Sequence, residues 1–337
     1  MTQISLHSQA QSVLVYPAEQ FTVVNGANLG DPLGLAEDLT HDDIYRLSAA
    51  ASAARLNVVG TGPQQFRVGN EGDLGTPGAQ LHIDCCVTLM SGNGDTSECI
   101  VLVETNRTGG IVALYILPLA PLSARTDYAL VGVDTQGALQ KFGQISSVSF
   151  TRGTRITLAT GAQKPVERLQ IGDRVLTRDE GPQDVRWIGH STVRAVGSFA
   201  PILIRKGTLN NSNDLVVSPD HRLFIYQRTD HLGTGRAEVL VKARHLVNGS
   251  SVQRLTGGFV EYYQMLFDTH QIIYAEGIAA ESMLVSPQSC ATLPAEVARR
   301  LSDIVPHQKP SFDDIEVQEA LLTRPDIATL LRRSSGG

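Results

Sequence analysis

Turn-forming residues interrupt the second half of the chain at short intervals, and this spacing limits what that half can fold into. Between residues 149 and 287, short apolar runs alternate with Thr-Gly, Ile-Gly-Asp and Glu-Gly-Pro turns. Many short strands at regular intervals are typical of an all-β sandwich or barrel-like domain. We therefore expect an all-β domain at residues 149–287.

The first part of the chain, residues 1–148, also favours strands. The apolar runs QLHIDCCVTLM and ECIVLVE flank the turn sequence SGNGDTS, which predicts a hairpin. One exception is DDIYRLSAAASAARL, residues 42–56, whose alanine content and apolar spacing predict a short helix capped by Thr40 or Asp42. We expect a β-rich N-terminal module whose role the sequence does not reveal, because it contains no catalytic cluster.

After Pro287 the apolar residues take up helical spacing. This holds for LPAEVARRLSDIV and DIEVQEALLTRPDIATLLRR, where Pro294 fits a first helical turn and Pro325 a helix end. The sequence thus predicts a mainly β chain in three parts, the last a helical C-terminal extension at residues 288–337.

Charge is distributed unevenly along the chain. Residues 1–148 carry 6 basic and 14 acidic residues, a net charge of −8, while residues 149–337 carry 22 and 20, a net charge of +2. Neither part has the basic surface that nucleic-acid binding requires. We therefore expect no nucleic-acid partner.

The N-terminal sequence MTQISLHSQAQSVLVYP does not resemble a cleavable signal peptide, since it lacks a basic region and a continuous apolar region. No run of 18 apolar residues occurs, so we also expect no membrane span. Two locations stay open: the cytoplasm, or export by a route that needs no signal peptide.

The four cysteines do not form a metal-binding pattern. Adjacent Cys85 and Cys86 on a strand would point to opposite faces, so they cannot easily share a ligand. Cys99 lies across the predicted hairpin and could reach one of them, but reduced, buried thiols are the favoured interpretation. With Cys290 far away and no Cys/His spacing typical of zinc, we predict neither a metal nor a cofactor.

Two polar clusters interrupt the apolar pattern of residues 149–287. Ser218 and His221 lie three residues apart at a strand end, where a hydroxyl can bind a backbone amide and an imidazole can move a proton. Taken alone, the Pro-Asp between them favours an ordinary turn. Asp268 and His270 would share a face if they lay on a strand, but a solvated strand end explains them equally well.

The order of these motifs resembles that of the Hedgehog/intein (Hint) domain family of the bacterial type, over residues 149–285. Members open with Cys or Ser followed by a strand such as Phe150–Thr154, and Ser218 and His221 match their Thr/Ser-x-x-His motif. Further matches form an early segment and a closing segment: Pro165, Val166, Glu167, Leu169, Gly172, Asp173, Val175 and Leu176, then Asp268, His270, Ala275, Gly277 and Ile278. The resemblance implies an all-β, horseshoe-like fold with pseudo-twofold halves.

The resemblance also implies a self-directed reaction whose substrate is the chain's own N-terminal segment. The Ser149 hydroxyl would attack the preceding carbonyl, converting the Val148–Ser149 amide to an ester. The resemblance gives His221 the role of protonating the departing nitrogen, and Ser218 that of polarising the scissile group. Asp268 and His270 would assist proton movement or resolution of the ester. Such an autoprocessor acts once and is not a turnover enzyme.

The sequence differs from the family pattern at two places, and these differences limit the reaction that we expect. Ser149 replaces the more usual cysteine, and a hydroxyl is the weaker nucleophile at neutral pH. The closing residues are Glu281 and Ser282 instead of the His-Asn pair whose cyclisation completes splicing, so we expect N-terminal cleavage without splicing.

Two alternatives stay open. The first is a Hint scaffold that has lost its reaction and serves in export or protein interaction, with partners that the sequence does not identify. The second is a conventional hydrolase using Ser149, His221 and Asp268, which is disfavoured because the chain has no Gly-x-Ser-x-Gly context at the serine.

Overall fold

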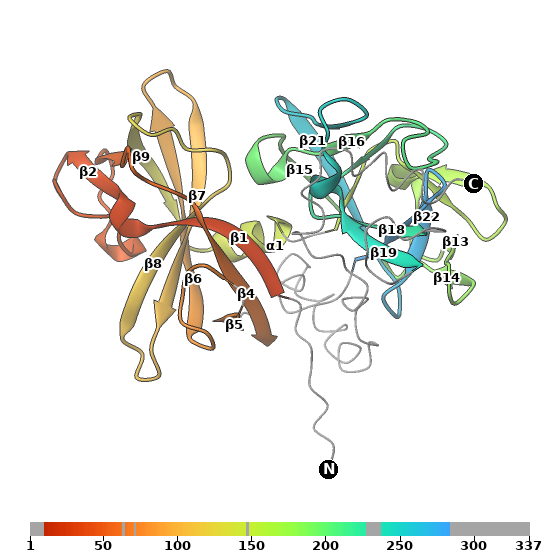
Figure 1. Ribbon diagram of the computed structural model, residues 1–337, viewed down its shortest axis with the longest axis horizontal. Coiled ribbons are helices and arrows are strands. Elements are labelled where there is room, and N and C mark those ends of the chain that lie inside the picture. The colour runs from red at the N-terminus through yellow and green to blue at the C-terminus, as the bar shows by residue number, and fades with distance from the viewer. Residues whose placement is uncertain (1–9, 63–64, 71, 146–147, 227–236, 284–337) are drawn as a thin grey trace, which may run out of the picture. The chain divides into compact units, whose positions relative to one another are not determined.

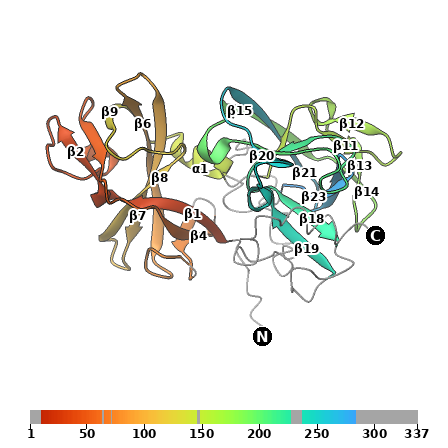
Figure 2. The ribbon, with the colours of Figure 1, turned by 45° about the horizontal axis from the view of Figure 1, so that its top comes forward.

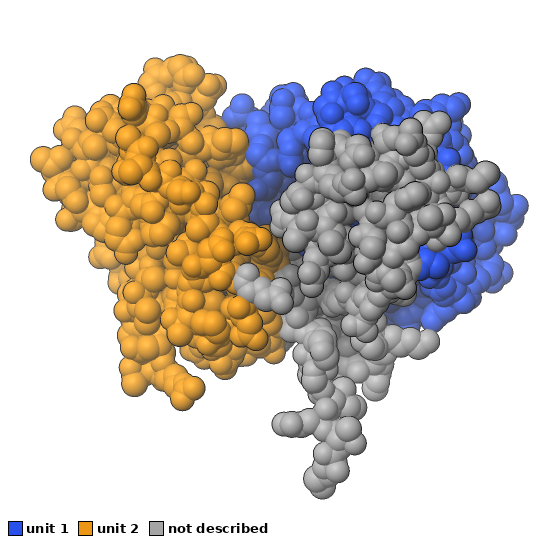
Figure 3. Space-filling model, in the orientation of Figure 1, with its two compact units in different colours: residues 1–7, 145–285, 293–337 blue, residues 8–144, 286–292 orange. Residues whose placement is uncertain are grey.

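The computed structural model describes residues 10–62, 65–70, 72–145, 148–226 and 237–283. The chain divides into two compact units, drawn in different colours in Figure 3. Of the described residues, those from 10 to 144 belong to one unit, called the N-terminal unit. Those from 145 to 283 belong to the other, called the C-terminal unit.

The N-terminal unit is built from nine antiparallel strands (Figure 1). They are β1 (Ala10–Pro17), β2 (Phe21–Asn25), β3 (Ile44–Leu47), β4 (Ala54–Gly62), β5 (Gln65–Val68), β6 (Gln80–Ser91), β7 (Thr96–Thr105), β8 (Ile111–Pro118) and β9 (Asp127–Asp134). The helix α1 (Ala138–Ile145) follows β9.

Strand β6 organises this unit because it is long enough to pair with three other strands. It pairs with β7 along most of its length, with β5 at Gln80–Leu81, and with β9 from Cys86 to Ser91. The pairings β6–β7–β8–β1–β4–β5–β6 form a closed circuit, and β9, β3 and β2 extend the sheet beyond it. Each of these six strands pairs with at least two others, although β1 contacts β8 only at Tyr16 and Pro17.

The helix predicted over residues 42–56 is wrong. This segment instead forms β3 and the start of β4, separated by a turn at the alanine-rich stretch. In β3 the buried Tyr45 and Leu47 flank the exposed Arg46, and β3 pairs with both β2 and β9. Pairing on two edges and burial of an alternating face outweigh the helical propensity of alanine, which is a weak preference.

The cysteine expectation agrees with the structure for the three cysteines described. Cys85 and Cys99 lie in the same apolar core, whereas Cys86 lies outside that cluster, and all three are free and buried. Lys141 donates a hydrogen bond to Cys86 Sγ across 3.6 Å and to Glu98 Oε1 across 2.6 Å. Burial raises the pKa of the Cys86 thiol to about 11, which keeps it protonated at neutral pH.

The C-terminal unit contains two six-stranded antiparallel sheets and a separate hairpin (Figures 1 and 2). The first sheet has the order β15–β21–β10–β17–β16–β20: β15 (Trp187–Arg194), β21 (Phe259–Leu266), β10 (Phe150–Thr151), β17 (Leu215–Val217), β16 (Ile202–Ile204) and β20 (Val252–Arg254). The second has the order β12–β11–β22–β23–β18–β19: β12 (Gln163–Pro165), β11 (Arg155–Thr157), β22 (Ile272–Ala275), β23 (Ile278–Glu281), β18 (Arg222–Tyr226) and β19 (Glu238–Lys242). The hairpin pairs β13 (Arg174–Leu176) with β14 (Pro182–Asp184).

Both sheets contribute to one apolar core. Phe150 and Val217 from the first sheet lie in the same cluster as Ile156, Leu223 and Ala280 from the second. The prediction of a mainly β chain is confirmed, since α1 is the only α-helix within the described residues. The helices predicted after Pro287 lie outside those residues. In the described part of the chain, no helix is both long enough and apolar enough to span a membrane.

Candidate functional site

Ser149 lies immediately before β10, in the middle of the first sheet of the C-terminal unit. Phe150 in β10 pairs with Val217 of β17 on one side and with Tyr263 of β21 on the other. Continuing these antiparallel registers brings Ser149 beside Ser218 and Gln264. Ser149 is only 2% exposed, so its hydroxyl is shielded from bulk water.

Two hydrogen bonds join Ser149 to Ser218. The backbone N–H of Ser149 donates to the Ser218 hydroxyl oxygen across 3.1 Å, and the Ser218 N–H donates to the Ser149 carbonyl across 2.9 Å. The nitrogen held by Ser218 belongs to the predicted Val148–Ser149 reaction bond. The hydroxyl therefore contacts the amide side of that bond.

The segment from Ser218 to His221 is a hydrogen-bonded turn, as its Pro-Asp content suggests. The His221 N–H donates to the Ser218 carbonyl across 3.1 Å, and Asp220 forms an ion pair with Arg244 at 2.9 Å. The turn directs the His221 side chain into the core, where it is 0% exposed and lies 4.4 Å from the Phe150 ring, centroid to centroid.

His221 also contacts Ser149. Its Nδ1 lies 3.1 Å from the Ser149 carbonyl oxygen. Because a carbonyl oxygen only accepts hydrogen bonds, we assign the hydrogen of the neutral ring to Nδ1 and the free lone pair to Nε2. Within the described part of the chain, Nε2 is buried and makes no hydrogen bond of standard geometry.

Burial dominates the electrostatics of His221. It lowers the pKa of His221 to about 4, because the imidazolium ion loses its hydration inside the core. The Glu281 carboxylate and backbone contacts with Ser149 and Glu281 act in the opposite direction, while Arg222 adds to the lowering. At neutral pH the imidazole is therefore uncharged and can accept a proton.

Gln264 is a site residue that the sequence analysis missed. Its Nε2 donates a hydrogen bond to the Ser149 hydroxyl across 3.2 Å, and the residue is 8% exposed. The available signal was a polar residue in the apolar run YYQMLF. Recognising its role requires the register between β21 and β10, which are more than a hundred residues apart in sequence.

Asp268 and His270 do not lie on a strand, so of the two interpretations left open the shared strand face does not hold. Strand β21 ends at Leu266 and β22 begins at Ile272, and the residues between them form a turn. Without the strand repeat, the two side chains need not point the same way. The Asp268 side chain is 55% exposed, whereas that of His270 is 4% exposed.

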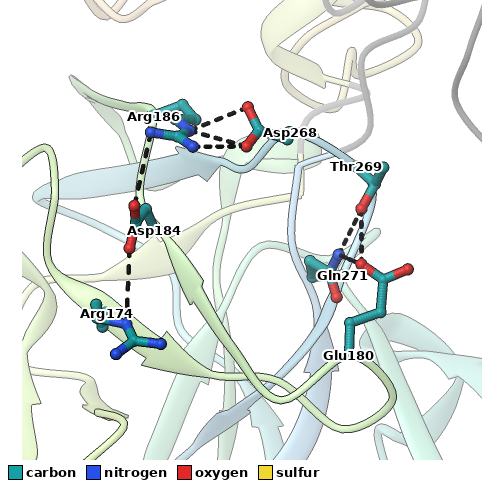
Figure 4. A network of polar contacts seen from close by, with 7 residues as sticks. All are labelled: Arg174, Glu180, Asp184, Arg186, Asp268, Thr269 and Gln271. Carbon is teal, nitrogen blue, oxygen red and sulfur yellow. Dashed lines mark hydrogen bonds and ion pairs between the residues drawn. The ribbon is translucent and has the colours of Figure 1, made fainter.

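Asp268 belongs to a surface network and has no polar contact with Ser149, Ser218 or His221 among the described residues. It forms a two-pronged ion pair with Arg186, with its shortest N–O distance at 2.7 Å (Figure 4). Figure 4 also shows Thr269 and Gln271 turned toward Glu180, which accepts hydrogen bonds from both.

His270 instead meets a buried ion pair that the sequence analysis did not anticipate. Glu281 is 0% exposed, and its carboxylate lies 3.1 Å from Arg222 Nε and 3.4 Å from His270 Nε2. Burial by itself would raise the pKa of Glu281, but Arg222, His270 and His221 outweigh it and lower that pKa. Glu281 is therefore ionised at neutral pH.

No group of three or more His, Cys, Asp or Glu side chains suited to hold a metal ion occurs in the part of the chain that the structure describes. The polar side chains at this site instead contact Ser149. They comprise a hydroxyl, its hydrogen-bond donor, a hydroxyl at the adjacent amide and a neutral imidazole. Such a set can support acyl transfer at a neighbouring carbonyl.

Comparison with a protein-family model points to the same segment. Residues 148–287 match the family model described as the Hint domain. The catalytic subunit of the V-type proton ATPase of Candida tropicalis is 30% identical over 83 residues, which are 24% of this chain and only 8% of that protein. The crystal structure of the gp41-1 intein matches 40% of this chain and 97% of its own, at 13% identity and a TM-score of 0.26.

Proposed function

We propose that residues 148–287, which form a Hint domain, cleave their own chain at Val148–Ser149 through an N–O acyl shift, without splicing. The substrate is then the chain's own N-terminal segment, and each molecule reacts once. Cleavage would release residues 1–148 from residues 149–337.

One observation carries this proposal: three side chains contact three different groups of Ser149. Ser218 binds its backbone N–H, His221 its carbonyl and Gln264 its hydroxyl, at 3.1, 3.1 and 3.2 Å. Fixed geometry matters because the attack is intramolecular, and orientation accounts for much of the acceleration in such reactions. The three contacts fix the positions of the hydroxyl that would attack and of the nitrogen in the bond that would break.

The acyl shift balances without any other reactant, and the cleavage that follows it consumes one water molecule. The Ser149 oxygen bonds to the Val148 carbonyl carbon, the bond from that carbon to the Ser149 nitrogen breaks, and an ester and a free amine result. In this proposal His221 takes the proton from the hydroxyl and returns it to the departing nitrogen. Water then attacks the ester carbon, and the Ser149 hydroxyl is regenerated.

In this proposal His270 and Asp268 have more limited roles than Ser149, Ser218 and His221. His270 acts on proton movement only through Glu281, which it contacts. Asp268 is limited to the resolution step, since its carboxylate is exposed and paired with Arg186. Splicing is disfavoured because the closing residues are Glu281, held in an ion pair with Arg222, and Ser282, and neither can cyclise as asparagine does.

A second candidate function is a Hint scaffold without the reaction, serving as an interaction module. Ser149 itself favours this candidate, because a hydroxyl is a poorer nucleophile than the cysteine thiol more usual at this position. The two candidates differ in one measurable event, which is breakage of the chain.

Intact mass spectrometry of the purified full chain at neutral pH, with and without hydroxylamine, tests the proposal. Hydroxylamine attacks esters, so it should release residues 1–148 as the hydroxamate. Ser149→Ala and His221→Ala should abolish the cut, whereas His190→Ala and Ser191→Ala, on strand β15, should retain it. A wild-type chain that stays at full mass with hydroxylamine would overturn the proposal in favour of the interaction module.

A further inference from the structure

Strand β15 has a glycine at the position that faces Gln264, the residue whose side chain is bonded to the Ser149 hydroxyl. Gly189 pairs directly with Gln264 in the register between β15 and β21, and Gln264 donates to Ser149 across 3.2 Å. Directly opposite residues of antiparallel strands point to the same face, with Cβ atoms about 4.5–5.5 Å apart. Because β21 lies between β15 and β10, the space above Gly189 adjoins the Gln264 side chain on the side away from Ser149.

The Trp187 ring fills that space. Trp187 lies two residues before Gly189 in β15 and therefore on the same face of the strand. A Cβ placed on Gly189 would overlap Cη2 and Cζ2 of the ring and would lie 2.9 Å from its Cζ3. The six-membered half of the indole thus covers the glycine, at the place where a side chain of residue 189 would stand beside Gln264.

The space above the strand requires this glycine, whereas its backbone conformation does not. The φ angle of Gly189 lies outside the left-handed region, so alanine could adopt the same conformation. Glycine weakens the interior of a strand, and in such a position it often marks the close approach of another group. Here that group is the indole, which an added methyl group would displace.

The position of the indole bears on Ser149 through Gln264. A glutamine side chain has several rotatable bonds, so its amide stays on one partner only if its neighbours restrict them. Site geometry is held most precisely by side chains whose rotamers are fixed by packing. The indole restricts Gln264 from one side, and the hydrogen bond with Ser149 restricts it from the other.

We propose that Trp187 is a positioning residue for the acyl shift: its indole, which Gly189 admits, holds the Gln264 amide against the Ser149 hydroxyl. The inference rests on the proposed self-cleavage. In this role Trp187 needs no contact with a reacting atom, because it acts only through Gln264.

A double-mutant cycle on the full chain tests this role. Trp187→Leu removes the indole, and Gly189→Ala displaces it without removing it. Each should slow hydroxylamine-induced cleavage roughly fivefold, which is the loss expected for Gln264→Leu. Combined with Gln264→Leu, neither should slow cleavage further, since a group that acts through Gln264 has no effect once Gln264 is replaced.

Two matched variants serve as controls for the cleavage rate. Phe259→Leu replaces another aromatic residue of the same sheet, one that is exposed on β21. Gly132→Ala, on β9, adds a Cβ that would lie 3.5 Å from the Thr88 side chain, which is an ordinary contact. Both should cleave at the wild-type rate.

A second readout does not depend on cleavage. Trp187 is the single tryptophan of the chain, so the fluorescence emission reports its surroundings alone. Gln264→Leu replaces the amide beside the ring with an apolar side chain, and the emission maximum should move to shorter wavelength. Gln253→Leu, on strand β20, should leave it unchanged.

The two readouts can each overturn the inference. A loss in the double variants that equals the product of the single losses would show that Trp187 acts independently of Gln264. An unchanged emission maximum in Gln264→Leu would overturn the inference even if the variants at Trp187 and Gly189 fail to fold. A wild-type chain that never cleaves would overturn the proposed function instead, and the emission would still report whether the indole packs on Gln264.

Discussion

The Ser218 hydroxyl oxygen lies 3.1 Å from the backbone nitrogen of Ser149 and accepts its hydrogen bond. Because that nitrogen belongs to the Val148–Ser149 bond, Ser218 contacts the amide that would break, and not its carbonyl oxygen. The contact exists because β17 ends at Val217 where β10 begins at Phe150. Ser218 therefore fixes the orientation of the amide and leaves stabilisation of the carbonyl to other groups.

Removing this hydroxyl should weaken both the fold and the reaction. Ser218→Ala leaves the Ser149 N–H buried without its acceptor, which costs about 1–3 kcal/mol of unfolding free energy. We also expect slower hydroxylamine-induced cleavage, because the amide loses its fixed orientation. Denaturant unfolding and intact mass measure the two effects. Ser218→Thr keeps the hydroxyl and should retain cleavage; equal losses in both variants would contradict this role.

Replacing Gln264 should change the rate of self-cleavage more than it changes the stability of the fold. Gln264→Leu removes the N–H that donates to the Ser149 hydroxyl, and with it a hydrogen bond to the oxygen that would attack. A hydrogen bond of this kind contributes about 1 kcal/mol, which corresponds to a roughly fivefold slower cleavage. The measurement is the rate of hydroxylamine-induced cleavage by mass spectrometry. Gln253→Leu, on strand β20, is the control, and an unchanged rate in Gln264→Leu would exclude Gln264 from the reaction.

The sequence predicted some of these relationships because they depend on local patterns. Short strands follow from the spacing of turn residues, and Ser218 and His221 could be paired because they lie in one turn. Their meeting with Ser149 followed only from the family resemblance. The helix predicted over residues 42–56 was wrong because this segment includes β3. The pairing of β3 with β9, which is distant in sequence, cannot be inferred from a local pattern.

The contacts of other site residues could not be predicted from the sequence, for a related reason. The contact of Gln264 with Ser149 and that of Arg222 with Glu281 depend on the register between strands far apart in the chain. A one-residue shift would turn each side chain to the other face of its sheet. Whether Asp268 and His270 share a strand face stayed open because the end of β21 at Leu266 is not marked in the sequence.

Replacing Asp268 should have little effect on the acyl shift. Asp268→Asn removes an exposed ion pair with Arg186, and such pairs contribute about 0–1 kcal/mol to stability. Hydroxylamine itself attacks the ester, so the induced cleavage does not depend on the step assigned to Asp268. The induced cleavage rate should therefore stay within about twofold of the wild type. Arg186→Gln, which removes the other partner, should behave alike. A tenfold or larger loss of induced cleavage in Asp268→Asn alone would show that Asp268 acts earlier than we propose.

A cysteine in place of Ser149 should accelerate the reaction. Ser149→Cys supplies a thiol, which is the stronger nucleophile and yields a thioester that thiols cleave readily. We expect dithiothreitol to release residues 1–148 from this variant at least about tenfold faster than hydroxylamine releases them from the wild type. Time-resolved intact mass gives both rates. If Ser149→Cys stays intact with dithiothreitol, the surrounding residues do not support an acyl shift, whatever the nucleophile.

The stability of the C-terminal unit should fall as the pH drops below neutrality, because of His221. Burial lowers its folded-state pKa from 6.5 to about 4, so between these values the unfolded chain binds the proton more tightly than the folded one. The contribution is fully present above pH 6.5 and is lost as the pH falls toward 4, by about 3 kcal/mol in total. Glu281, whose folded pKa is also lowered, adds a further loss only below its unfolded value of about 4.3.

Trp187 makes this measurable for one unit alone, since it is the single tryptophan of the chain and lies in β15 of the C-terminal unit. Urea unfolding followed by its fluorescence at pH 7, 5.5 and 4.5 should give a steadily decreasing unfolding free energy. His221→Gln cannot take up a proton, so its free energy should change less over this range, whereas His190→Gln should keep the wild-type slope. An equal slope in wild type and His221→Gln would mean that another group controls the acid sensitivity and that His221 is not buried as a neutral imidazole.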